Sequence, residues 1–186
     1  MVRWIMGSMA LLFVLATARA QEGRAGLLLG SASIAPGHIP AQDLSTAYVV
    51  GTLSYFVEDR ISFQGRGAWY VASDEAAAVL PEHHGLSVGP LYHWGKDRLD
   101  LHTGPEAGIT FTRLAAPGAS DAPPRVKVLP MMAWNAGVTY YVWDHFHFFL
   151  DIRYQYANYV GSPTGSMALG EMTFAGGLGF QLDTRP

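Results

Sequence analysis

The chain has no cysteine and little charge. Among its 186 residues, Asp, Glu, Lys and Arg together make up 15%, whereas roughly 25% is usual for a soluble domain. The missing thiol excludes a disulfide scaffold, a cysteine-ligated zinc module and a lipid-anchored lipoprotein. A net charge of −3 gives no reason to expect a nucleic-acid partner. A disordered chain is also excluded, because it would carry more charge and fewer aromatic residues than the 12% found here.

Long hydrophobic runs are confined to the N-terminus. Arg3 is followed by an uncharged stretch that ends in the small-residue pattern Ala18, Arg19 and Ala20, which is typical of a cleaved secretory signal peptide. The alternative is a retained anchor, but about 15 residues at 1.5 Å each reach only about 22 Å, less than a hydrocarbon core of roughly 30 Å. We therefore expect a signal peptide at residues 1–20 and one domain at residues 21–186.

The rest of the chain alternates between apolar and polar residues. Strand side chains point to opposite faces with a period of two, so this pattern predicts β-strands. Residues 60–71, 99–112 and 147–159 alternate most clearly. In the last of these, one face holds Phe148, Leu150, Ile152, Tyr154 and Tyr156, and the other holds Phe149, Asp151, Arg153, Gln155 and Ala157.

Five further stretches bring the expected number of strands to eight. Their connections are short and long in turn, which predicts a closed antiparallel up-and-down meander built from four hairpins. The five stretches are residues 25–33, 46–57, 86–94, 127–142 and 172–182, and the long loops are expected at about 34–45, 73–85, 114–126 and 160–170.

The apolar face of these strands is bulky and aromatic, while the opposite face mixes Gly and Ala with charged residues. Small and charged side chains together suit the narrow interior of an eight-stranded barrel, and bulky apolar ones suit lipid. We therefore predict an all-β, eight-stranded transmembrane barrel. A soluble sandwich or a periplasmic lipocalin-like binding protein is the alternative, and either would have the reverse polarity of faces.

Aromatic residues are expected to form two girdles at the two membrane interfaces. One set lies toward the short turns and the other toward the long loops. The first comprises Tyr55, Phe56, Tyr92, Trp94, Tyr140, Tyr141, Trp143, Phe146 and Phe180, and the second comprises Trp69, Tyr70, Phe111, Tyr156 and Tyr159.

With these features the chain resembles the small eight-stranded outer-membrane β-barrels of Gram-negative bacteria, the group around the transmembrane domain of OmpA and the OmpX/Ail proteins. The resemblance rests on strand count, loop rhythm and the glycine-rich closing segment at residues 170–182, although its aromatic Phe180 is not the last residue. It implies an outer-membrane location with the termini in the periplasm. The partners it implies are outer-membrane lipids, lipopolysaccharide and the barrel assembly machinery, and it implies a monomer.

The polar residues of the inward face are expected to form a satisfied network of hydrogen bonds and ion pairs, because buried charges must be paired. Arg66 and Arg153 are the expected cationic members, with Glu106 and Asp151 as acids. The alternative is a narrow pore for small solutes. The whole expected network is Gln64, Arg66, Asp100, His102, Glu106, Asn135, Asp151, Arg153 and Gln155.

No catalytic residue, cofactor or metal ligand is expected. His83 and His84 are assigned to a solvated loop, and His145 and His147 to a turn. Some barrels of this size modify lipid A, but the deacylase type carries a His-x-Ser pair that does not occur here, and the palmitoyltransferase type has a helix before its barrel. We expect a structural, envelope or surface-binding role, with a pore, a lipid A-modifying enzyme or a periplasmic binding protein as alternatives.

Overall fold

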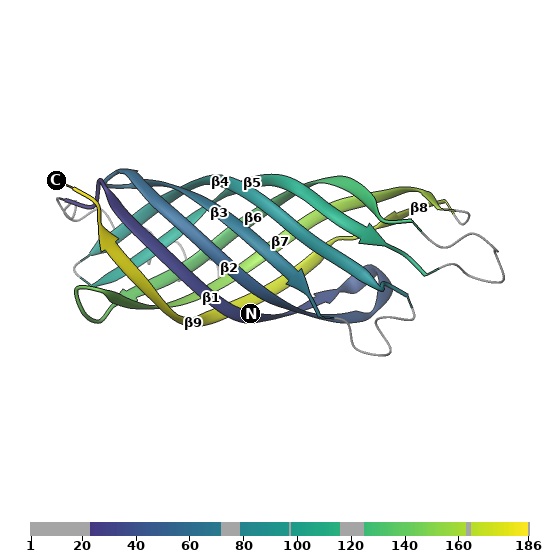
Figure 1. The fold of residues 1–186 in the computed structure, drawn as a ribbon, viewed down its shortest axis with the longest axis horizontal. Coiled ribbons are helices and arrows are strands. Elements are labelled where there is room, and N and C mark those ends of the chain that lie inside the picture. Colours follow the sequence, from purple (N-terminus) through teal and green to yellow (C-terminus); the bar gives the residue numbers. More distant parts are fainter. Residues whose placement is uncertain (1–22, 72–78, 97, 116–124, 163–164, 186) are drawn as a thin grey trace, which may run out of the picture.

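A computed structural model describes residues 23–71, 79–96, 98–115, 125–162 and 165–185 of the chain. The expected signal peptide at residues 1–20 lies outside these ranges. Within them, no helix is long and apolar enough to cross a membrane. The described residues form one tall barrel of strongly tilted strands, with the short turns at one end and the longer connections at the other (Figure 1).

The described residues form nine strands and one 3₁₀ turn, and each segment whose alternation predicted a strand is a strand. They are β1 (Leu27–Ile39), η1 (Pro40–Gln42), β2 (Leu44–Glu58), β3 (Ile61–Tyr70), β4 (Glu82–Lys96), β5 (Leu99–Arg113), β6 (Lys127–Tyr141), β7 (Phe146–Ser162), β8 (Gly165–Ala168) and β9 (Glu171–Asp183).

Each long strand pairs antiparallel with its neighbours, and β9 pairs with β1 to close the ring. The short strand β8 stands apart, since it pairs only with the far end of β7. Eight strands therefore form the barrel wall, as predicted. At the closing seam, Leu27 faces Asp183, and the ladder is interrupted between Ser31 and Gly37 before it resumes in the same register. Pro36, which lacks an N–H donor, lies in that interruption.

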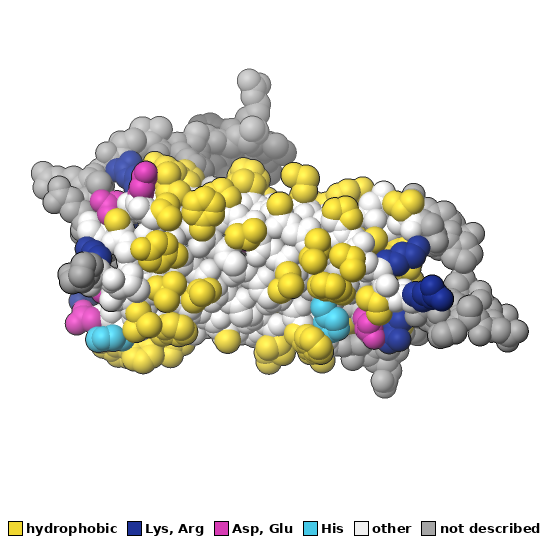
Figure 2. Space-filling model, turned by 45° about the horizontal axis from the view of Figure 1, so that its top comes forward, with side chains coloured by type: hydrophobic (Ala, Val, Ile, Leu, Met, Phe, Trp, Pro, Cys, Tyr) yellow, Lys and Arg dark blue, Asp and Glu magenta, His cyan; other side chains and the backbone are white. Residues whose placement is uncertain are grey.

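The polarity of the two faces is the predicted one. In β7, Phe148, Leu150 and Ile152 are exposed, while Asp151 and Arg153 are buried in the barrel. Figure 2 shows hydrophobic side chains over the flank of the barrel, with charged side chains gathered at the two ends. A belt of this kind matches the outward apolar band of transmembrane barrels and is the reverse of a lipocalin.

Several strands are longer than predicted. β1 continues to Ile39, so residues 34–39 are strand and the first loop shrinks to η1 and Asp43. β4 begins at Glu82, inside the second predicted loop, and β7 runs to Ser162. The Pro, Gly and His residues in these segments hid their alternation, because they are weak strand formers in isolation.

Not every aromatic residue takes part in a girdle. Phe56 and Tyr159 point into the barrel and are buried, which corrects the prediction that placed them at the membrane interfaces. Tyr70 is buried as well, as the inward parity of its strand predicts, so it does not belong to a girdle. Tyr70 packs with other apolar residues inside the long-loop end of the barrel. The remaining interior at that end is filled by Leu129, Met131, Ala157, Tyr159 and Leu169.

Two Gly-Pro pairs bring β4 and β5 unusually close. A Cβ at Gly89 would overlap the carbonyl oxygen of Pro105, and one at Gly104 would overlap that of Pro90. Glycine is therefore required at both positions, because any side chain would force the backbones apart. The β4–β5 ladder is interrupted here, between Val88 and Tyr92.

Asp59, in the turn between β2 and β3, holds the segment that leads into β1. Its Oδ1 accepts the backbone N–H of Arg24 at 2.9 Å and that of Ala25 at 3.0 Å. The hydrogen bond from the Ala25 N–H is the main cause that lowers the pKa of the Asp59 carboxyl below its ordinary value, and the bond from the Arg24 N–H adds to it. The carboxylate is therefore better stabilised in the folded chain than in the unfolded one.

Acidification should release this contact. Because the pKa of Asp59 is lower in the folded chain than in the unfolded chain, its carboxylate stabilises the fold fully above the ordinary carboxyl pKa of about 4. This stabilisation is lost as the pH falls through the lower pKa of the folded chain. We expect the wild type to lose more stability between about pH 5 and pH 2 than Asp59→Asn, measured as urea midpoints in detergent micelles. Parallel pH profiles for the two proteins would contradict this role.

Candidate functional site in the barrel lumen

All the polar residues predicted for the interior are buried inside the barrel. They come from β3, β5, β6 and β7, whose inward faces meet across the lumen. The structure divides most of them into two groups, one near the short turns and one near the long loops, with the Gln64–Asn135 contact between the groups. The buried residues are Gln64, Arg66, Asp100, His102, Glu106, Asn135, Asp151, Arg153 and Gln155.

The group near the short turns, called here the turn-end cluster, is built on Asp100. Arg24 Nη1 lies 2.7 Å from Asp100 Oδ1, and Nδ1 of His93 lies 2.6 Å from Oδ2 of the same carboxylate. The other ring nitrogen of His93 lies 2.8 Å from the hydroxyl of Ser62. One carboxylate thus joins a cation and an imidazole, and the Phe56 ring packs against that imidazole.

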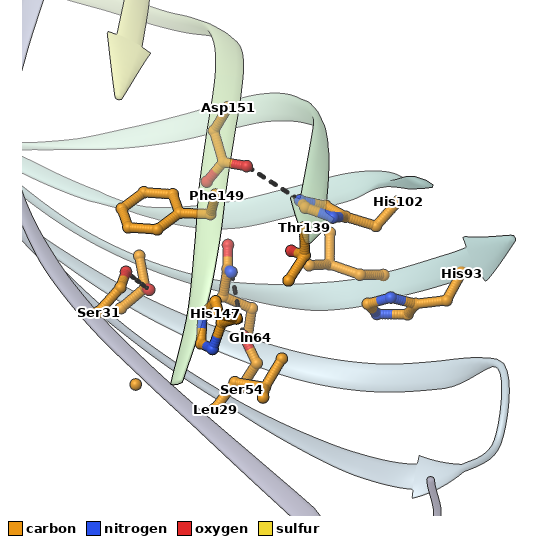
Figure 3. Close-up of a pocket in the computed structure, with 13 residues that line it drawn as sticks. Leu29, Ser31, Ser54, Gln64, His93, His102, Thr139, His147, Phe149 and Asp151 are labelled. Atoms are coloured by element: carbon orange, nitrogen blue, oxygen red, sulfur yellow. Dashed lines mark hydrogen bonds and ion pairs between the residues drawn. The ribbon is translucent and has the colours of Figure 1, made fainter. Parts of the chain in front are cut away.

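His102 and Asp151 complete the turn-end cluster. Nε2 of His102 lies 3.0 Å from Oδ1 of Asp151, so this contact joins β5 to β7 across the intervening strand β6. Figure 3 shows His93 and His102 beside one another and Asp151 facing His102. This pair depends on Gly137 of β6, since a Cβ there would overlap Oδ1 of Asp151.

The group near the long loops, called here the loop-end cluster, is built on Arg153. Its Nε donates to Oε2 of Glu106 at 2.9 Å, and its Nη1 donates to Oε1 of Gln155 at 2.5 Å. The same Glu106 oxygen accepts the hydroxyl of Ser87 at 2.8 Å. The sequence predicts both residues as members of interior ion pairs but does not say which arginine meets which acid; the structure pairs Arg153 of β7 with Glu106 of β5.

Glu171 is the second acid of the loop-end cluster. Tyr48 donates its hydroxyl to both carboxylate oxygens at 2.9 and 2.8 Å, and Thr46 also donates to this carboxylate. Gln155 Nε2 donates to it at 2.5 Å, which connects Glu171 to Arg153 through one amide. The buried carboxylate thereby has several donors, as a buried charge requires.

His83 belongs to this cluster rather than to a solvated loop. It lies on the inward face of β4, with its Nδ1 2.9 Å from Thr112 Oγ1 and its Nε2 3.2 Å from Gln155 Nε2. The assignment of His83 to solvent is therefore wrong. His147, which was assigned to a turn, is likewise buried inside the barrel.

Arg66 departs from its predicted role. Its Nε and Nη1 have no hydrogen-bond partner among the described residues, and no acid of the described chain lies within ion-pair distance. Its β3 neighbour Gln64, which lies between Ser62 and Arg66 on the inward face of the strand, bonds across the lumen instead. Gln64 donates to Ser54 at 3.0 Å and accepts the amide of Asn135 at 3.3 Å, from the opposite side of the lumen.

The turn-end cluster contains one arrangement that the sequence did not indicate. Ser62, His93 and Asp100 follow the hydrogen-bond order of a serine hydrolase triad, with hydroxyl to Nε2 and Nδ1 to carboxylate. Catalysis would also require substrate access and an oxyanion site. Ser62 is completely buried, and the cavity of about 30 Å³ beside its partner His93 has room for only about one or two waters. An acyl substrate does not fit this space.

The residues that sequence reasoning missed are Arg24, Ser62, His83, His93 and Glu171. Strand parity could have found His93 and Glu171, because each shares an inward face with residues that were recognised. Arg24 carried no such signal, since it precedes β1 and reaches Asp100 only once the ring is closed.

Replacing Gly137 with alanine should break the His102–Asp151 contact, because the new methyl would occupy the place of the Asp151 carboxylate. We expect a destabilisation of about 1–3 kcal/mol, the usual cost of overpacking. Gly51→Ala is the matched control, since the nearest atom to its Cβ is 4.0 Å away. Equal urea midpoints for the two variants would show that the glycine is not needed for this pair.

Comparison with known proteins identifies the fold. No protein-family model matches the sequence, and no curated protein matches it significantly. Among solved structures, the outer membrane protein OprG of Pseudomonas aeruginosa is similar with a TM-score of 0.61 at 13% identity, over 88% of this chain and 99% of that one. The N-terminal β-barrel domain of OprF from the same organism gives 0.54 at 18% identity, over 84% and 98%.

A third similar structure is Ail, the attachment invasion locus protein of Yersinia pestis, solved in complex with the heparin analogue sucrose octasulfate. It gives a TM-score of 0.56 at 14% identity, over 84% of this chain and 99% of that one. The apolar belt and this shared architecture both fit the bacterial outer membrane, the location that the sequence predicts. The chain therefore has the eight-stranded transmembrane β-barrel fold of these outer-membrane proteins.

Proposed function

We propose that this chain is a non-catalytic envelope protein, a rigid barrel in the outer membrane whose lumen is closed. The observation that carries the proposal is the set of contacts across the lumen between strands that are not neighbours. Glu106 of β5 meets Arg153 of β7, and Gln64 of β3 meets Asn135 of β6. Side chains that bond across the axis leave no straight path for solutes.

Small cavities inside the barrel support a closed lumen. One of about 30 Å³ lies beside His93, His102 and His147, and one of about 10 Å³ lies beside Arg66 and Arg153. The first has room for about one or two waters and the second for about one at most. A structural role also suits the buried Ser62, which has the partners of a nucleophile without the space for a substrate.

Two measurements test this proposal. In planar lipid bilayers the folded protein should give no stepwise conductance, and reproducible single-channel steps would favour a pore instead. A fluorophosphonate probe should leave Ser62 unlabelled, and labelling that disappears in Ser62→Ala would favour an enzyme. A mobility difference between heated and unheated samples on a denaturing gel reports that the barrel is folded in both experiments.

The proposed partners follow from the same surface. Outer-membrane lipids and lipopolysaccharide would surround the belt, the assembly machinery would insert the chain, and the protein would act as a monomer. An apolar hollow of about 470 Å³ on the outer face of β3 and β4, beside Trp69, Leu86 and Phe111, has the size and polarity for an acyl chain. A change in apparent mass on crosslinking in membranes would contradict a monomer.

Surface binding at the long-loop end is the second candidate function. β7 continues past its last pair with β6, at Ala157, and pairs with β8 to form a hairpin that projects from the barrel (Figure 1). Projecting elements on a rigid scaffold are common recognition surfaces, and Ail was solved with a heparin analogue. Salt-sensitive retention of the folded protein on heparin beads would support this candidate, and no retention would favour a purely structural role.

A further inference from the structure

The turn-end cluster brings three potential metal ligands to one point in the lumen. His93 of β4 and His102 of β5 are Cα partners in the antiparallel ladder, so both imidazoles emerge on the inward face at the same height. Asp100 lies two residues before His102 and shares that face. Ligand atoms of all three residues lie within 4.8 Å of one another, and all three side chains are buried.

Imidazole nitrogen and carboxylate oxygen are the ligands that Zn²⁺ takes from a cysteine-free chain, at about 2.0–2.2 Å from the ion. Nδ1 of His93 lies 2.6 Å from Oδ2 of Asp100. A bound ion would replace the proton that these two atoms share, and both His93 Nδ1 and Asp100 Oδ2 would then be ligands. Arg24 already occupies the other carboxylate oxygen, Oδ1, and would hold the carboxylate in place.

An independent observation points to a ligand at this position. Because Nε2 of His102 is bonded to Asp151, its Nδ1 is left without a hydrogen-bond partner among the described residues, although the side chain is only 7% exposed. Nδ1 of His147, on the same cavity, is unpartnered as well. A buried polar atom without a partner is costly, so such atoms mark places where something else binds.

Asp151 has the role that a carboxylate takes behind a metal-bound histidine. By accepting the proton on Nε2 of His102, it fixes the ring orientation and leaves the lone pair on Nδ1 free to bind an ion. The cavity of about 30 Å³ lies beside the two histidines and Asp151, as Figure 3 shows. His93 and His102 thus both line the cavity, and Asp100 bonds His93 beside it.

The local charge favours a cation. Asp100 and Asp151 contribute −1 each and Arg24 contributes +1, so the cluster carries −1 when its imidazoles are neutral. Imidazole nitrogen ligands favour a d-block ion such as Zn²⁺ over Mg²⁺ or Ca²⁺, which prefer oxygen ligands.

We propose that the barrel lumen binds one divalent d-block cation through His93, Asp100 and His102, with Asp151 as a positioning residue behind His102. The site revises the expectation that the chain holds no metal. It does not depend on the proposed closed lumen, because the ion can enter while the barrel folds. An ion there would tie β4 to β5 and, through Asp151, to β7.

The test uses the untagged chain refolded in detergent micelles with Zn²⁺ and then exchanged into metal-free buffer. Elemental analysis should find about one Zn²⁺ per folded chain, the stoichiometry of a single closed site, and no retained Mg²⁺. Protein refolded with Co²⁺ should show the visible absorption of an ion held by nitrogen and oxygen ligands. Failure of the wild type to retain Zn²⁺ would overturn the proposal.

Three variants locate the site. His102→Asn should lose the ion, and Ser62→Ala, which alters only the second partner of His93, should keep it. Asp151→Asn should weaken binding by about 10–100-fold, as expected for a residue behind a ligand. Equal retention by the wild type and by folded His102→Asn would place the ion on a surface histidine and refute the site. If His102→Asn does not fold, the Asp151→Asn affinity and the Co²⁺ spectrum of the wild type decide.

Discussion

Replacing Arg153 with methionine should destabilise the folded barrel by about 3–5 kcal/mol, the cost of leaving one partner of a buried ion pair without the other. Arg153 and Glu106 are only 3% and 2% exposed. Without the guanidinium, the Glu106 carboxylate would keep the hydroxyl of Ser87 as its neighbour and would have no cation within ion-pair distance among the described residues. The measurement is reversible urea unfolding in lipid vesicles, followed by tryptophan fluorescence.

Two controls separate this effect from the loss of any arginine. Arg98→Met, at an exposed position beside a short turn, should change stability by no more than about 0.5 kcal/mol. The double variant with Glu106→Gln and Arg153→Met should recover part of the loss, because no uncompensated charge remains. If Arg153→Met costs no more than Arg98→Met, the ion pair is not a stabilising element of the lumen.

An arginine at Ile152 should cost about 2–4 kcal/mol, although the next residue along the strand is an arginine that the barrel buries. Ile152 points outward from the middle of β7, is 41% exposed, and lies between Ala136 of β6 and Phe174 of β9. A charge on the lipid-facing side of a barrel is expensive near the bilayer midplane, because it must leave water without a partner.

The control for Ile152→Arg is an outward-facing residue that lies farther from the middle of the membrane. Val160 also points outward, but it lies beyond the last pair of β7 with β6, so Val160→Arg should cost only about 0–1 kcal/mol. Urea midpoints in vesicles of one lipid composition compare the two. Equal costs would mean that Ile152 does not face the hydrocarbon core, and the proposed membrane placement of this flank would fail.

Much of the fold could be predicted because period-two alternation reports directly on which side of a strand faces lipid. Ile152 and Arg153 are assigned to opposite faces by that rule alone, and the structure confirms both. The ends of the strands could not be predicted, because His38, His83 and Gly85 extend β1 and β4 through pairing with neighbours rather than through their own preference.

The sequence predicted which polar residues face the lumen, but it did not predict which of them contact one another. Parity identifies Asp100, His102 and Asp151 as inward-facing, but the height at which each enters the lumen depends on the register of three ladders. The pairing of His93 with His102 follows from the β4–β5 register, which the sequence does not encode locally. Arg66 was expected to form an ion pair because it is charged. Whether an acid lies within its reach depends on the register of the strands around the closed ring, which the sequence does not show.

The closing seam fixes the order of the strands around the ring but leaves open which strand comes first in the chain. β1 and β9 meet at the short-turn end, where Thr184 donates its backbone N–H to Gly26 at 3.0 Å and its hydroxyl to the same carbonyl at 2.6 Å. A short linker could span this contact, and the chain could be cut instead in the turn around Asp59. Because the ring of pairings would be unchanged, such a circular permutant should reach the same barrel with a different pair of strands at its ends.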